Sequence, residues 1–151
     1  MTRAGEGWYR RWMRLHAVVL LLALFACKRT APTPAPVVPE GPSAGDVCRQ
    51  LEAVGVAHKC QVASRGDLGT IARSASEYVT FGITTTPGKP GKVLRFRNAA
   101  DFGDAVSGFE AAAFLIGPHR YGSSKALIFV QLPKETSADV GAKASAVVSA
   151  L

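Results

Sequence analysis

A proline-rich segment separates the N-terminal part of this chain from the part that can form a folded domain. Residues 28–45 read KRTAPTPAPVVPEGPSAG and contain five prolines. Proline lacks the backbone N–H donor that helices and inner strands need, and closely spaced prolines favour an extended polyproline II conformation. We therefore expect residues 27–45 to form an extended tether. It would join a short N-terminal segment, residues 1–26, to one small domain, residues 46–151.

The N-terminal segment has the charge and hydropathy pattern of an export signal. Arg3, Arg10, Arg11 and Arg14 precede an uninterrupted apolar run over residues 17–26. Ten helical residues cover about 15 Å, which is half of a ~30 Å hydrocarbon core. The run is thus too short to span a membrane and is typical of a cleaved signal. An uncleaved anchor is the alternative, although Arg14 and His16 prevent a longer apolar run.

The apolar run ends in Leu24-Phe25-Ala26-Cys27, which resembles the lipobox of bacterial lipoprotein precursors. The resemblance covers residues 1–27 only. It implies cleavage before Cys27, lipidation of that cysteine and a mature protein anchored in the bacterial cell envelope. Lys28 stands where an Asp commonly signals retention in the inner membrane, so the outer membrane is favoured. An ordinary secretory cleavage site is the alternative, but it requires small residues where Leu24 stands.

The remaining two cysteines are expected to form a disulfide. If Cys27 carries lipid, Cys48 and Cys60 are the only thiols left, and the envelope is an oxidising compartment. A metal or redox pair is the alternative. Metal sites usually need closer spacing and further ligands, and only His58 lies nearby in the sequence. We therefore expect no metal and no cofactor.

The net charge of +7 does not indicate a nucleic-acid partner. Residues 1–26 contribute +3, residues 28–45 contribute +1, and the domain itself carries only +3. A domain that binds nucleic acid usually concentrates more positive charge than this on one face. The expected partners are instead a membrane, reached through the lipid anchor, and an anionic envelope component or an envelope protein.

The domain pattern predicts an α+β fold. Apolar residues recur at helical spacing over residues 46–54, 99–116 and 137–151, and strand patterns cover residues 77–85, 92–97 and 126–132. The order α-β-β-α-β-α, with a further strand near Cys60 as an open alternative, predicts a small, mostly antiparallel sheet. We expect two or three helices on one face and a polar, solvated opposite face. Residues 61–76 are ambiguous.

Two groups of residues are candidates for binding. On the solvated sheet face we expect Tyr78, Arg95 and Arg97, opposite Val79 and Leu94, where they could contact an anionic partner. The alternative is a strand whose charges protect it from edge pairing.

The second group is His119, Arg120 and Tyr121, in the loop that follows Gly117-Pro118. Loops on a rigid scaffold often carry function, although a packed turn explains the same residues. No HExxH motif, nucleophile elbow or P-loop is present. We therefore expect a non-enzymatic binding or accessory module, with a small envelope enzyme that uses this loop as the alternative. A pocket holding all three side chains would favour the enzyme.

Overall fold

The computed structural model describes residues 41–64 and 69–151, which belong to a unit formed by residues 37–151. The predicted signal, Cys27 and residues 28–40 of the tether lie outside the described residues. In chain order the elements are α2 (Ala44–Ala53), β1 (His58–Val62), the 3-10 helix η2 (Thr70–Ala72), β2 (Glu77–Gly82), β3 (Gly91–Arg95), α3 (Ala99–Ala111), α4 (Ala113–Ile116), β4 (Arg120–Ser123), β5 (Ile128–Gln131) and α5 (Ala138–Ser149).

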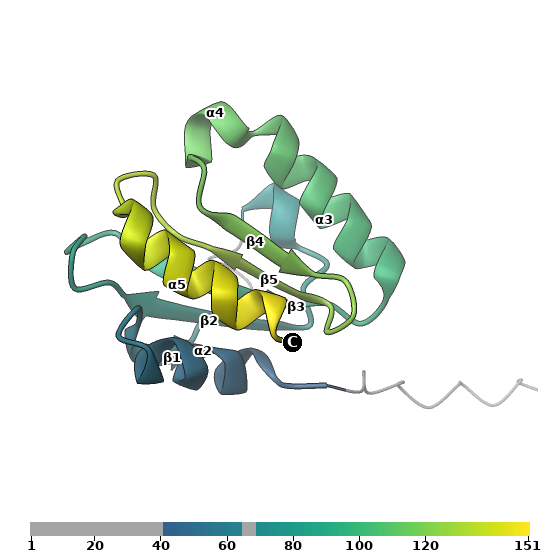
Figure 1. The fold of residues 1–151 in the computed structure, drawn as a ribbon. Coiled ribbons are helices and arrows are strands. Elements are labelled where there is room, and N and C mark those ends of the chain that lie inside the picture. The colour runs from purple at the N-terminus through teal and green to yellow at the C-terminus, as the bar shows by residue number, and fades with distance from the viewer. Residues whose placement is uncertain (1–40, 65–68) are drawn as a thin grey trace, which may run out of the picture. The chain divides into compact units, whose positions relative to one another are not determined.

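The described strands form one antiparallel sheet in the order β1-β2-β3-β5-β4 (Figure 1). The predicted α+β class and the antiparallel sheet are confirmed. The further strand near Cys60 is β1, at one edge. Strand β4, at the other edge, lies where the sequence predicted only a loop.

One face of the sheet is covered by α2 and α5. Val47 and Leu51 of α2 and Ala144 of α5 are buried in one core with strand residues that share this face. These strand residues are Val79, Phe81, Val93, Ile128 and Val130. Two helices thus pack on one face, as the amphipathic patterns predicted.

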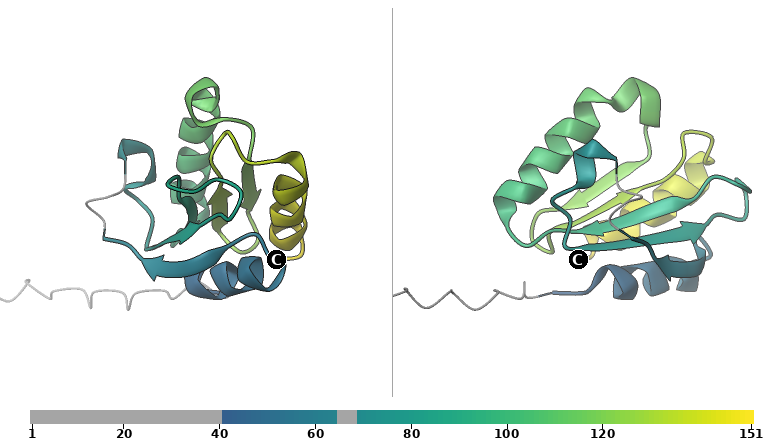
Figure 2. Two further views of the ribbon diagram at one scale, coloured as in Figure 1. Left: turned by 90° about the vertical axis from the view of Figure 1, so that its left-hand side faces the viewer. Right: turned by 180° about the vertical axis from the view of Figure 1, so that it is seen from behind.

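The opposite face is covered as well, by α3 and η2. Ala105 and Phe109 of α3 and Ala72 of η2 are buried in a second core. The sheet contributes Tyr78, Leu94 and Phe129, and Phe96, which follows β3, joins them; the ring of Phe109 stacks on that of Phe129 at 4.5 Å. Figure 2 shows the helices on both sides of the sheet. The expectation of a polar, solvated second face is therefore wrong.

The pairing of β2 with β3 explains this error. Val79 is opposite Val93, whereas Tyr78 is opposite Leu94. Because directly opposite residues share a face, Tyr78 and Arg95 lie on opposite faces of the sheet. Each is only 5% exposed. The predicted binding face of Tyr78, Arg95 and Arg97 does not exist. Of the three, only Arg97, which follows β3, is exposed.

Arg95 instead joins the start of the domain to the sheet. Its Nη1 donates to Glu77 Oε1 at 2.9 Å, and its Nη2 donates to the Gly41 carbonyl at 3.2 Å. The second carboxylate oxygen of Glu77 accepts the N–H of Ala44 at 2.8 Å, in the first turn of α2. A carboxylate there satisfies a helix donor that would otherwise have no partner.

Helix α2 begins two residues earlier than predicted, since Ser43 is its N-cap. The Ser43 hydroxyl accepts the Asp46 N–H, and the Asp46 carboxylate accepts the Ser43 N–H at 2.9 Å, which completes a capping box. The Asp46 carboxylate also accepts the Ser43 hydroxyl proton at 2.6 Å, and this bond together with that from the Ser43 N–H lowers the pKa of Asp46. The domain therefore includes residues that the sequence assigned to the tether.

A disulfide joins α2 to β1, as the cysteine count predicted. Cys48 and Cys60 are bonded with their Cα atoms 6.2 Å apart, within the usual range for disulfides. The bond closes a loop with a sequence separation of 12 residues. In the chain-entropy model, closing a loop of this length lowers the conformational entropy of the unfolded chain and thereby stabilises the folded state by about 3 kcal/mol.

None of the described helices has the length and hydropathy needed to cross a membrane.

We predict opposite outcomes for the two arginines that the sequence grouped together. Arg95→Ser should lower the free energy of unfolding by about 2 kcal/mol. The hydrogen bonds of the buried guanidinium are lost, and hydration of the Glu77 carboxylate offsets only part of that loss. Arg97→Ser, at an exposed site, should change it by no more than about 0.5 kcal/mol. Urea denaturation of the two variants measures both. Equal effects would contradict the burial of Arg95.

Candidate functional site

His119 and Tyr121 lie on the α5 side of the sheet and are bonded to each other. His119 Nε2 is 2.8 Å from the Thr136 carbonyl oxygen, and Nδ1 is 3.1 Å from the Tyr121 hydroxyl. Because a carbonyl only accepts, Nε2 carries a proton and donates it to the Thr136 carbonyl, and in the neutral form of the ring Nδ1 accepts from the Tyr121 hydroxyl. Burial raises the pKa of Tyr121. Both ring nitrogens are thus engaged in bonds within the fold.

Arg120 lies on the other side of the sheet from these two residues. Its Nη1 donates to the Phe109 carbonyl at 2.9 Å, and its Nη2 is 3.2 Å from Glu110 Oε2. Alternation along β4 explains the divergence, since successive side chains point to opposite faces. The three predicted loop residues therefore do not meet in one pocket. Instead, His119 attaches this segment to the β5–α5 loop at Thr136, and Arg120 attaches it to α3.

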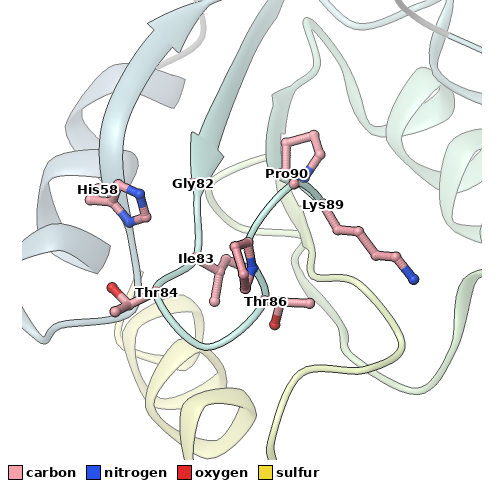
Figure 3. A pocket seen from close by; sticks show the side chains of 9 residues that line it. His58, Gly82, Ile83, Thr84, Thr86, Lys89 and Pro90 are labelled. Carbon is pink, nitrogen blue, oxygen red and sulfur yellow. The ribbon is translucent and has the colours of Figure 1, made fainter.

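A hollow of about 520 Å³ lies between the start of β1 and the β2–β3 hairpin (Figure 3). It is lined by His58 and by the hairpin residues 82–84 and 86–90. Two buried atoms of this lining, His58 Nδ1 and Thr86 Oγ1, have no hydrogen-bond partner among the described residues. Lys89 points away from His58, and its ammonium instead pairs with Glu135. The polar groups of this hollow do not converge on one point.

A second, shallow groove of about 390 Å³ brings together three segments that are distant in the sequence. We call it the lysine groove. Its charged lining residues are Lys89 and Lys92 from the hairpin, and Lys134 and Glu135 from the β5–α5 loop. Leu115 and Ile116 of α4 and Pro90 and Pro133 supply its apolar part. The hydrogen bond from Lys89 lowers the pKa of Glu135 and so favours its ionised form. The groove thus presents three lysines and one carboxylate.

Helix α4 adds an exposed apolar edge to the lysine groove. The sequence predicted one helix over residues 99–116, but a turn at Ala112 separates α3 from α4. Phe114 is 81% exposed and Leu115 is 64% exposed. We call these two side chains the α4 tip. They fall outside the helical stripe of Phe102, Val106, Phe109, Ala113 and Ile116, and this position outside the stripe is the sequence signal that could have identified them.

Among the described residues, no group of three His, Cys, Asp or Glu side chains is placed to hold a metal ion.

The contact of α5 with His119 and Tyr121 generates a paired prediction. A Cβ added at Gly141 would lie 2.5 Å from His119 Nδ1 and 2.7 Å from the Tyr121 hydroxyl, whereas one at Gly103 of α3 would meet nothing within 4 Å. Gly103→Ala should stabilise the protein by about 0.5–1 kcal/mol through helix propensity. Gly141→Ala should destabilise it despite the same propensity gain. Thermal unfolding compares the two, and stabilisation by both would show that His119 and Tyr121 are not held against α5.

Comparison with protein families, with curated proteins and with solved structures finds no match to this chain. Its function is therefore inferred from its own residues.

Proposed function

We propose that this protein is a lipid-anchored lipoprotein of the bacterial cell envelope whose domain is a non-enzymatic binding or accessory module. The observation that carries the proposal is the disulfide between Cys48 and Cys60. Structural disulfides persist in oxidising compartments such as the periplasm and are rare in the cytosol. The bond thus agrees with export through the segment that ends in Leu24-Phe25-Ala26-Cys27.

The hydrogen bonds of the predicted catalytic loop support binding over catalysis. A general base must reach the substrate proton, and a nucleophile needs a base beside it. His119 has both ring nitrogens engaged by Tyr121 and Thr136, and Arg120 bonds on the opposite face. A binding surface needs no such free groups.

The charge of the lysine groove supports an anionic partner. Lys89, Lys92 and Lys134 come from separate segments and face the same groove, with Glu135 as the one acid in its lining. We propose that this surface, rather than the buried Arg95, contacts an anionic envelope component. The domain charge of +3 gives no reason to propose nucleic acid. Lys28 in place of an Asp favours anchoring in the outer membrane.

The anchor is tested in the full chain by replacing either the proposed lipid-bearing cysteine or the two disulfide cysteines. Cys27→Ser should abolish labelling by fatty-acid analogues in a bacterial host, because that thiol is the proposed acylation site. The matched control, Cys48→Ser with Cys60→Ser, should keep the label, since those residues form the disulfide. In-gel detection of the analogue measures both. Labelling of the Cys27→Ser chain would refute lipid anchoring at Cys27. So would a parent chain that carries no label together with a Cys27→Ser chain that remains in the membrane fraction.

A further inference from the structure

The α4 tip exposes a phenylalanine and a leucine side by side. Large apolar side chains are usually buried when the fold can cover them. The other exposed large apolar residues among those described are Val54, which follows α2, and Val62 of β1. Strand β1 is at the opposite edge of the sheet from β4, which follows α4. The tip is thus the one place in the described domain where two such neighbours project together.

Lysines surround the base of this tip. Gly117 ends α4 with a φ of +86°, and a Cβ there would collide with the Cβ of Lys134. Glycine therefore permits the end of α4 to lie close against the β5–α5 loop. Leu115 lines the lysine groove with Lys89, Lys92 and Lys134. Figure 1 and the right panel of Figure 2 show α4, the β2–β3 hairpin and the β5–α5 loop at one end of the domain, which the left panel of Figure 2 shows head-on.

We propose that the α4 tip and the lysine groove dock the domain onto an anionic phospholipid bilayer. The inference rests on the proposed envelope location and names the partner of the groove. Surface-binding proteins place apolar side chains at the boundary between head groups and acyl chains, while neighbouring lysines attract anionic lipids. Phe114 and Leu115 would enter this boundary, and Lys92 and Lys134 would face the phosphates.

The composition of the surface favours a bilayer over a protein partner. A stable protein interface buries roughly 800 Å² on each partner and usually has a continuous apolar centre. Here three lysines lie among the apolar residues of the α4 tip and the groove, so the surface lacks a continuous apolar centre. A bilayer requires only that the tip project and that the surrounding charge be positive. A lipid anchor would also hold the domain at a high effective concentration beside the membrane, so that a weak contact is populated.

The proposed tether is long enough to permit this contact. The chain enters the domain at Gly41, whose carbonyl is bonded to Arg95 at the end of β3 opposite the hairpin. From Cys27 to Gly41 there are 14 residues, which reach about 43 Å if extended as polyproline II. A domain of this size is roughly 35 Å across. A tether anchored at Cys27 could therefore pass along the domain and let the tip face the bilayer.

Phe114→Trp in the full chain gives a direct test. The only tryptophans, Trp8 and Trp12, are in the predicted signal, and any emission they contribute is removed by subtracting the parent chain. The protein is purified from membranes and reconstituted into phosphatidylglycerol–phosphatidylcholine vesicles with brominated acyl chains. We expect bromine to quench F114W and its emission to shift to the blue. Val62→Trp, at a position that is 88% exposed, is the matched control and should stay unquenched.

The charge requirement is tested with two double variants built on F114W. Lys92→Ser with Lys134→Ser should lower the ratio of docked to undocked protein by roughly 30-fold in phosphatidylglycerol vesicles, at the usual contribution of a lysine near an anionic surface. Arg97→Ser with Lys125→Ser removes the same charge from exposed sites at the other end of the sheet and should leave quenching unchanged.

Flotation of the same vesicles reports the anchor separately from docking. A chain that floats while F114W is quenched no more than V62W would overturn docking and leave the anchor intact. Equal quenching in vesicles of phosphatidylcholine alone would overturn the role of the lysines. Emission of F114W that is already blue-shifted without lipid would show that protein covers the tip, and would also overturn the proposal.

Discussion

The structure depends on a central strand that is buried on both faces. Val93 of β3 faces α2 and α5, while Leu94, the next residue, faces α3. Helices must therefore cover both sides of the sheet, and each core stabilises the strand from its own side. Arg95 is the buried charged side chain of β3, and its burial is tolerated because Glu77 and the Gly41 carbonyl accept hydrogen bonds from its guanidinium. The same bonds attach the entering chain to the sheet.

The sequence predicted the elements better than it predicted their faces. Glu77–Gly82 alternates clearly, so its strand and the burial of Val79 and Phe81 could be inferred. In β3 both Val93 and Leu94 are apolar, and alternation cannot tell which one shares a face with Val79. Only the pairing register decides this, and it depends on contacts distant in sequence. Strand β4, RYGS, has no apolar alternation to detect. The disulfide was predictable because cysteine count and compartment, rather than geometry, determine it.

The sequence suggested a candidate site where polar residues are adjacent along the chain, but in the structure these side chains bond other parts of the fold. His119, Arg120 and Tyr121 are adjacent in sequence, but adjacent side chains of an extended segment point to opposite faces of the sheet. His119 and Tyr121 bond each other on the α5 side, whereas Arg120 bonds Phe109 and Glu110 of α3 on the other side. The lysine groove is the opposite case. Its lysines are Lys89, Lys92 and Lys134, which meet Leu115 only because the hairpin, α4 and the β5–α5 loop end at the same side of the domain. No motif in the sequence could show this, although the position of Phe114 and Leu115 outside the helical stripe indicated an unusual surface.

We propose that a disulfide-bonded domain is carried on a lipidated cysteine. The decisive measurement is the intact mass of the protein purified from bacterial membranes, with and without reduction. We predict a chain that begins at Cys27, is heavier than its residues by a diacylglyceryl group and usually an N-acyl chain, and gains two hydrogens on reduction. A mass that equals the unmodified 151-residue chain, or that does not change on reduction, would contradict the account.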